Sequence, residues 1–170
     1  GKSGQLANEL LAELPQGVTY LSLGRHDVDI TSYRELSAKI VPFKPNVIIN
    51  ASAYSAVDKA ETDIDAAYAL NETAVKILAT IAKENNGRFL HVSTDFVFDG
   101  DSSRANDVNS NPMPKSVYGA SKLAGELAIT KTYPQNSTIV RTSWLYSTFG
   151  DNFVKTMLRL MTEKEVLGIV

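Results

Sequence analysis

The chain has 170 residues, of which 44% are hydrophobic and 21% are charged, and its net charge is -2. These values fit one globular domain with a core of its own. The absence of cysteine excludes disulfides and thiolate metal sites. The lack of a basic block argues against a nucleic-acid partner, and no apolar run reaches the roughly 20 residues of a membrane span. We therefore expect a cytoplasmic protein that binds neither nucleic acid nor a membrane.

The chain opens on the spacing G-x-x-G-x-x-A, made by Gly1, Gly4 and Ala7, and an amphipathic helical run follows. Glycines before a helix let backbone N–H groups approach a pyrophosphate at the positive helix end. The strand that normally leads into this motif is missing from the sequence. Two interpretations therefore stay open, a cofactor loop and a plain turn.

Residues 18–23 (VTYLSL) are predicted to form the first strand. In a dinucleotide-binding fold, the residue roughly 20 positions after the glycines contacts the adenosine ribose. The window at 24–26 offers no acid there. Arg25 could contact a 2′-phosphate instead, which favours NADP(H), or it could be an exposed loop arginine.

A helix through 33–40, capped by Thr31 or Ser32 and stopped by Pro42, leads into a second predicted strand. This strand, residues 47–51, is a continuous apolar run, as expected of a strand covered on both faces. Small side chains follow it at 51–53, where a flat ligand could pass close to the backbone or where the chain simply forms a loop.

A long helical pattern over 65–84 carries Asn71 on its apolar stripe. A polar residue there needs partners, so Asn71 is either a structural bridge or part of a site. The next buried strand, residues 89–93, contains His91, which we interpret as a core histidine. With only two histidines and no cysteine, a catalytic zinc site is not expected.

The stretch from Ser93 to Lys122 carries the candidate chemistry. Tyr118 and Lys122 lie four residues apart at the start of a helical pattern and therefore share one face. A nearby ammonium lowers the pKa of a tyrosine, which can then exchange a proton with a carbonyl or an alcohol. Thr94 could hold the same oxygen. Because Tyr-x-x-x-Lys also occurs as an ordinary surface pair, the motif alone leaves both interpretations open.

The helix that begins near Val117 is expected to bury Leu123, Leu127 and Ile129. A further strand is predicted at 137–142 and a last helix after 152. The alternation of strands and helices predicts an α/β protein with a Rossmann-type, doubly wound parallel sheet. The candidates at 1–4, 51–53, 93–95 and 142–144 all lie at the carboxyl ends of strands, which is where ligands bind in such sheets.

These stretches together resemble the extended short-chain dehydrogenase/reductase family, and within it the dTDP-4-dehydrorhamnose reductases. The resemblance runs in order along nearly the whole chain. It rests on GQLA at 4–7, NASAYSAVDKAE at 50–61, VSTDFVFDG at 92–100, VYGASKLAGE at 117–126 and RTSWLY at 141–146.

The resemblance implies NAD(P)H-dependent reduction of the C4 keto group of dTDP-4-dehydro-L-rhamnose to dTDP-L-rhamnose. Tyr118 would give its proton to the C4 oxygen, Lys122 would lower the tyrosine pKa and hold the nicotinamide ribose, and Thr94 would hydrogen-bond the reacting oxygen. Tyr118 would also contact the cofactor. The other implied cofactor contacts are Gly1, Gly4, Gln5 and Leu6 at the pyrophosphate, Asp29 and Ile30 at the adenine, and Ala51, Ser52 and Ala53 along the ribose-phosphate. The implied substrate contacts are Asp58, Thr94, Trp144 and Asn152.

Some features depart from the family pattern. Phe96 stands where a tyrosine is common, so a hydroxyl contact to the sugar is lost. The first, central strand is missing, and so is a substrate lobe after Val170, so we expect this chain to be part of a longer protein. In this view residues 1–150 belong to the NAD(P)-binding domain and residues 151–170 begin the truncated substrate-binding region.

Two rival functions remain. One is a related epimerase or dehydratase. Dehydratases place a Glu after Thr-Asp to work with the Asp in eliminating water, and this chain has Phe96 at that position, which disfavours dehydration. A non-catalytic subunit resembling the regulatory subunit of methionine adenosyltransferase is the other.

The expected partners are a dTDP-sugar and a second copy in a homodimer, with 65–84 and 117–132 as candidate faces. The choice between NADPH and NADH stays open, and no cluster predicts the divalent cation that some relatives hold.

Overall fold

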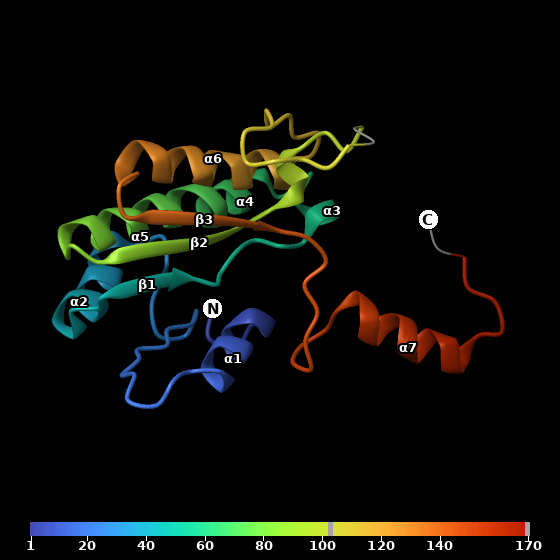
Figure 1. The fold of residues 1–170 in the computed structure, drawn as a ribbon, viewed down its shortest axis with the longest axis horizontal. Coiled ribbons are helices and arrows are strands. Elements are labelled where there is room, and N and C mark those ends of the chain that lie inside the picture. Colours follow the sequence, from blue (N-terminus) through green and yellow to red (C-terminus); the bar gives the residue numbers. More distant parts are fainter. Residues whose placement is uncertain (102–103, 169–170) are drawn as a thin grey trace.

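A three-stranded parallel sheet forms the centre of the computed structural model, which describes residues 1–101 and 104–168. Its strands are β1 (Val47–Asn50), β2 (Arg88–Thr94) and β3 (Ser137–Thr142), in the order β1-β2-β3 (Figure 1). Asn50 pairs in register with His91, and Thr94 with Thr142. The three carboxyl ends therefore lie at one edge of the sheet.

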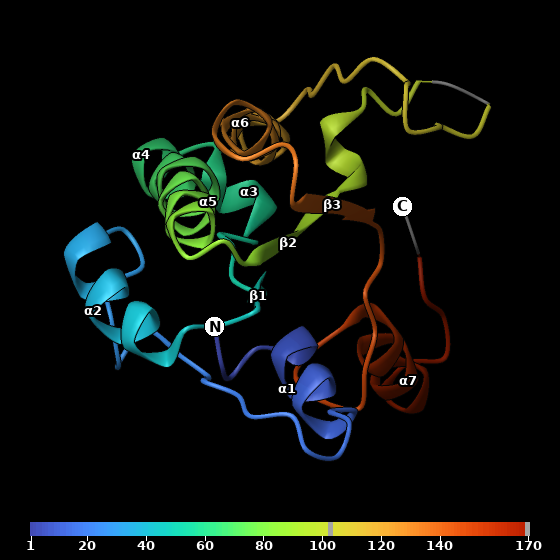
Figure 2. The ribbon, with the colours of Figure 1, turned by 60° about the vertical axis from the view of Figure 1, so that its left-hand side comes forward.

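One face of this sheet is covered by a helical layer (Figures 1 and 2). Phe89 of β2 is buried against this layer in a core that includes Ile81 and Ile129. The layer consists of α4 (Ile64–Tyr68), the π-helical turn η1 (Ala69–Thr73), α5 (Ala74–Glu84) and α6 (Val117–Thr132), and α2 (Tyr33–Phe43) packs beside α5. The remaining elements are α1 (Gln5–Ala12), α3 (Val57–Ala60), the 3-10 turn η2 (Asp95–Val97) and α7 (Phe153–Glu163).

The opposite side of β1 is open. Val47 and Ile49 are 47% and 43% exposed, so the prediction that this strand is covered on both faces is wrong for these residues. Helices α1 and α7 lie on this side but stand apart from the strands in Figure 2. Among the described residues, no helix is long and apolar enough to cross a membrane.

The predicted strand at 18–23 is also wrong, because residues 18–23 form no helix or strand. The backbone N–H of Lys2 donates to the Leu23 carbonyl (3.2 Å), and the Gly1 amino group donates to the Ala51 carbonyl (3.1 Å). The first two residues thus separate the end of 18–23 from the end of β1. The backbone hydrogen bonds at the two ends of this segment join Val18 to Pro15 and Leu23 to Lys2, and these do not make the ladder that a strand needs.

The predicted helix over 65–84 is present, but its path changes at Asn71. The turn η1 lies between α4 and α5, and Asn71 is fully buried within it. Its amide accepts from the Tyr54 N–H (2.9 Å) and donates to the Tyr54 carbonyl (3.1 Å) and to the Ser121 hydroxyl (2.9 Å). Asn71 is therefore a structural bridge, the first of the two predicted alternatives.

The buried face of α6 differs from the expected leucine stripe. Leu127 is 61% exposed, although Ile129 is buried as predicted. The buried positions also include Gly119, Ser121, Lys122, Gly125 and Glu126. A Cβ atom on Gly125 would lie 2.1 Å from the Asn71 carbonyl oxygen, and one on Gly119 would lie 2.2 Å from the Phe96 carbonyl oxygen. Small residues are needed here because the backbones touch.

The contact between Gly125 and η1 gives a stability test. Glycine-to-alanine changes inside helices normally stabilise by up to about 1 kcal/mol. At Gly125 the clash reverses the sign, and we expect Gly125→Ala to destabilise the protein by about 1–3 kcal/mol. Urea denaturation of the whole protein measures this. Gly168→Ala is the control, since a Cβ there meets nothing within 4 Å. A neutral or stabilising Gly125→Ala would contradict the packing described.

Candidate active site

The site begins where β2 ends and α6 starts. Thr94 is the last residue of β2, and Tyr118 lies in the first turn of α6. Two acceptors hold this turn: the Ser116 hydroxyl accepts from the Gly119 N–H (3.0 Å), and the Glu61 carboxylate accepts from the Val117 N–H (2.8 Å). Caps of this kind satisfy N–H groups that have no partner within the helix. They fix the position of the tyrosine.

Tyr118 keeps its proton in this environment. Burial raises the pKa of the Tyr118 hydroxyl above its usual value, a hydrogen bond with Thr94 acts in the opposite direction, and the charge of Asp95 raises it further. Sequence reasoning predicted a pKa lowered by Lys122. The direction differs because the Lys122 ammonium is directed to β2, where its Nζ donates to the Val92 carbonyl (2.6 Å).

Lys122 is almost fully enclosed, with 2% of its surface exposed. Its Nζ also lies 3.3 Å from Nε2 of His91. Burial lowers the pKa of Lys122 to about 8, and the charge of Glu126 opposes that shift. Glu126 itself forms an ion pair with Arg141 of β3 (2.6 Å). The lysine therefore titrates much closer to neutral pH than an exposed lysine does.

His91 is the core histidine that the sequence predicted, and it is fully buried. Its Nδ1 lies 3.1 Å from the side-chain nitrogen of Asn50. The pKa of His91 is lowered to about 3, first by burial and then by the charge of Lys122. Its contact with Lys122 was missed. The sequence does carry a signal for a buried polar cluster, because Asn50 and His91 are polar residues in two apolar strands. Their pairing, however, depends on the strand register, which the sequence does not give.

Asp95 follows Thr94 at a predicted strand end, but the sequence assigned it no role in the reductase site. Its carboxylate accepts from the Thr94 hydroxyl (3.2 Å) and from the Ser143 hydroxyl (2.8 Å). It therefore links the end of β2 to the segment after β3. Phe96 lies edge-on to the Tyr118 ring, with the ring centroids 5.6 Å apart. Together these contacts form one wall of the site.

The glycine-rich start lies at the same edge, where Gly1 contacts Ala51. Helix α1 has no side-chain cap and no acidic residue in its first turn. A Cβ on Gly1 would meet nothing within 4 Å, and one on Gly4 would meet only the Gly1 carbonyl at 3.3 Å. Free N–H groups, open space and missing carboxylates are what a pyrophosphate requires. The arrangement fits a dinucleotide cofactor.

The other predicted binding residues are distributed around this edge. Asp29 is exposed and accepts from the Thr31 N–H and hydroxyl, while Ile30 packs against the core. Asn152 donates to the Gln5 side chain (3.1 Å) and so joins α7 to α1. Other exposed residues of the predicted set are Arg25 in a turn, Ala53 after β1, Asp58 on α3 and Trp144, whose ring packs edge-on against Phe153.

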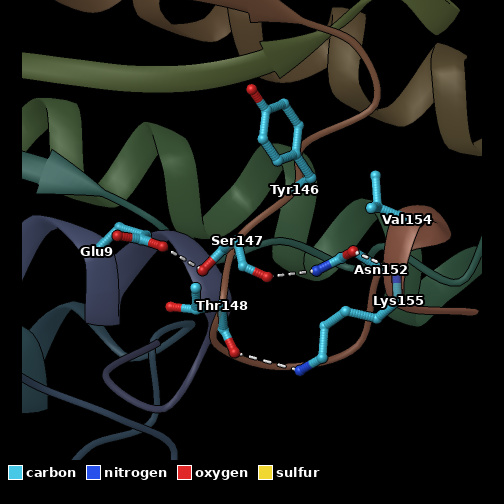
Figure 3. A pocket seen from close by; sticks show the side chains of 7 residues that line it. All are labelled: Glu9, Tyr146, Ser147, Thr148, Asn152, Val154 and Lys155. Carbon is cyan, nitrogen blue, oxygen red and sulfur yellow. Dashed lines mark hydrogen bonds between the residues drawn. The ribbon is translucent and has the colours of Figure 1, made fainter. Parts of the chain in front are cut away.

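A hollow of about 570 Å³ lies between α1 and the segment that leads into α7 (Figure 3). The Ser147 hydroxyl donates to the Glu9 carboxylate across it, and Lys155 reaches back to the Gly150 carbonyl (2.6 Å). The first bond holds the segment to α1, and the second holds it to the start of α7. The lining residues are Glu9, Tyr146, Ser147, Thr148, Asn152, Val154 and Lys155.

Comparisons with known proteins agree with this geometry. A family model described as "RmlD substrate binding domain" matches residues 1–170. A dTDP-4-dehydrorhamnose reductase of Aggregatibacter actinomycetemcomitans is 44% identical over 172 residues, covering all of this chain and 58% of that protein. The structure of dTDP-4-dehydrorhamnose reductase from Bacillus anthracis in complex with NADP matches with a TM-score of 0.93 at 37% identity, over 97% of this chain and 59% of that one.

A second solved structure, the dTDP-4-dehydrorhamnose reductase ortholog of Clostridium acetobutylicum, matches with a TM-score of 0.91 at 38% identity. It covers 96% of this chain and 58% of that one. These matches confirm the predicted Rossmann-type α/β fold. The chain spans just under three fifths of the length of the relatives it matches.

The buried state of His91 predicts how stability depends on pH. The pKa of His91 is about 3 when folded and 6.5 when unfolded, so the unfolded state binds more protons between these values. Stability therefore falls as pH falls through this window, in total by roughly 4 kcal/mol. We expect His91→Gln to remove this slope in urea titrations. His26→Gln, which changes an exposed histidine, should retain it, and an unchanged slope in His91→Gln would contradict the assignment.

Asp95 gives a test of the site's electrostatics. Because its charge raises the pKa of Tyr118, we expect Asp95→Asn to lower that pKa. Thr94→Val should act in the opposite direction, since it removes the hydrogen bond that favours the phenolate. Tyrosine-labelled 13C NMR across alkaline pH measures both changes, with the Tyr118 signal assigned from Tyr118→Phe. Equal Tyr118 pKa values in all three proteins would show that this wall does not act on the hydroxyl.

Proposed function

The chain belongs to the RmlD substrate binding domain family, and from this we propose that the whole protein reduces the C4 keto group of dTDP-4-dehydro-L-rhamnose to dTDP-L-rhamnose with NAD(P)H. The observation that carries the proposal is the position of Tyr118, in the first turn of α6, beside Thr94 at the carboxyl end of β2. The reductase names of the relatives in Aggregatibacter and Bacillus support the same substrate class.

The cofactor would lie along the carboxyl edge of the sheet. Gly1, Gly4 and the first turn of α1 would hold its pyrophosphate, and Ala51 to Ala53 would border the ribose-phosphate. Asp29 and Ile30 would border the adenine. The bound reduced nicotinamide supplies a hydride to C4. The relative from Bacillus is in complex with NADP, which supports NADPH over NADH, and exposed Arg25 offers a cation for a 2′-phosphate.

Tyr118 acts as the proton donor in this proposal. Its raised pKa keeps the hydroxyl protonated at neutral pH, which is the state that a reduction requires. As C4 gains a hydride, the C4 oxygen takes the Tyr118 proton, and the tyrosine is left as a phenolate. The Thr94 hydroxyl orients the oxygen. Lys122 is assigned to the nicotinamide ribose. Its ammonium would favour the phenolate once it faces Tyr118 instead of the Val92 carbonyl.

The nucleotide sugar is assigned to Asp58, Trp144 and Asn152. The exposed Asp58 and Trp144 have free surface for such a contact. Asn152 is already engaged, because its amide nitrogen donates to Gln5 (3.1 Å) and to the Ser147 carbonyl (2.8 Å). We therefore propose that Asn152 supports the sugar site by fixing the start of α7.

Both rival functions have less support. Eliminating water needs a second carboxylate beside Asp95, and the following residue is Phe96. A binding subunit has no need for Thr94, Tyr118 and Lys122 together.

Two predictions from the sequence remain predictions. One is a homodimer through α5 and α6, and the other is the division into an NAD(P)-binding domain at 1–150 and the start of the substrate-binding region at 151–170.

The proposal is tested by following nicotinamide absorbance when the whole protein meets dTDP-4-dehydro-L-rhamnose, with NADPH and NADH side by side. We expect rapid oxidation, and we expect Tyr118→Phe to lower kcat by about 10²–10⁴-fold because it removes the proton donor. The control Tyr20→Phe changes a tyrosine that is 60% exposed and should retain activity. A folded, cofactor-binding protein that oxidises neither cofactor would rule out this substrate.

A further inference from the structure

A chain of polar side chains runs through the core from β1 to α6. It begins at Ser52, passes through Asn50 and His91, and ends at Lys122. Asn50, His91 and Lys122 are only 3%, 0% and 2% exposed. Buried polar groups of this kind need matched donors and acceptors, so the direction of each hydrogen bond can be worked out.

The direction is set at Ser52. Its backbone N–H donates to the Asn50 side-chain oxygen (3.0 Å), and its hydroxyl donates to the same oxygen (2.6 Å). A backbone N–H can only donate, so the Asn50 oxygen must face Ser52. The Asn50 amide nitrogen then faces His91, with 3.1 Å between it and Nδ1. Nδ1 therefore accepts, and the neutral imidazole carries its proton on Nε2.

The Nε2–H group in turn faces Lys122, whose Nζ lies 3.3 Å away. An ammonium has no lone pair to accept this hydrogen, whereas a neutral amine has one. The same Nζ donates to the Val92 carbonyl (2.6 Å), which either form can do. The hydrogen-bond chain is therefore complete only with Lys122 as the neutral amine.

We propose that His91 is a positioning residue whose Nε2–H, oriented by Ser52 and Asn50, holds Lys122 against β2 and favours its neutral amine. This deepens the proposed function, on which it rests, because only the ammonium form of Lys122 favours the Tyr118 phenolate. The chain then sets how much of Lys122 is charged, and with it the pH at which activity declines on the alkaline side.

Other charges act on the same group. Burial lowers the pKa of Lys122 to about 8, in the same direction as the His91 contact, and Glu126 on α6 opposes it. The Glu126 charge is balanced by Arg141 on β3 (2.6 Å). Asp95 of η2 acts on Tyr118 rather than on the lysine. Among these groups, His91 is the one whose effect depends on a tautomer.

The tautomer is measurable without substrate or cofactor. In 15N-histidine NMR of the whole protein, we expect His91 to be neutral, with a protonated Nε2 and a bare Nδ1, from about pH 5 to pH 8. The signals are assigned by their loss in His91→Gln. An Nδ1–H tautomer, or an imidazolium in this range, would overturn the proposal. Because this measurement needs no turnover, it stands even if the reductase assignment fails.

Asn50→Asp provides the kinetic test. A carboxylate can accept from Ser52 and also from Nδ1–H of His91, which reverses the tautomer and leaves Nε2 as an acceptor for an ammonium. We expect the alkaline limb of kcat/KM to move to higher pH by about one unit or more. The control His26→Gln should leave the limb unchanged. The new carboxylate also raises the Lys122 pKa by its charge alone, so the His91 tautomer is measured in the same protein. An unmoved limb, or a moved limb with His91 still protonated on Nε2, would contradict the proposal. If Asn50→Asp does not fold, the NMR result on the unmodified protein decides.

Discussion

The site depends on the close approach of α6 to the two turns beside it. Gly125 touches the carbonyl of Asn71, and Gly119 touches that of Phe96. These contacts leave no room for side chains, so they fix the distance of α6 from the sheet. Tyr118 and Lys122 lie on that helix, and Thr94 ends the strand beneath it. The relative placement of the three groups therefore follows from backbone packing.

Most of the strands and the candidate site could be predicted from sequence, because they follow from local pattern. The strand at 137–142 has the predicted bounds and is rich in β-branched residues, and Thr94, Tyr118 and Lys122 stand out by residue type and spacing. The buried face of α6 could not be predicted in this way. Glycine, serine, lysine and glutamate do not resemble a core face, yet Gly125 and Lys122 are buried there while Leu127 is exposed.

Non-local pairing accounts for the other differences. Residues 18–23 have the composition of a strand, but a strand exists only beside a partner, and residues 1–2 occupy the position next to its end. The contact of His91 with Asn50 depends on strand register. The raised pKa of Tyr118 depends on where the Lys122 side chain points. Sequence supplied the groups, and packing decided which of them interact.

We propose that the carbonyl carbon of a dTDP-sugar receives a hydride at this edge while Tyr118 protonates its oxygen. The most direct measurement is a reaction of the whole protein with dTDP-4-dehydro-L-rhamnose and NADPH deuterated at the transferable position. The account predicts one deuterium at C4 of the product. A product without deuterium at C4, or with the label at another carbon of the sugar, would contradict it.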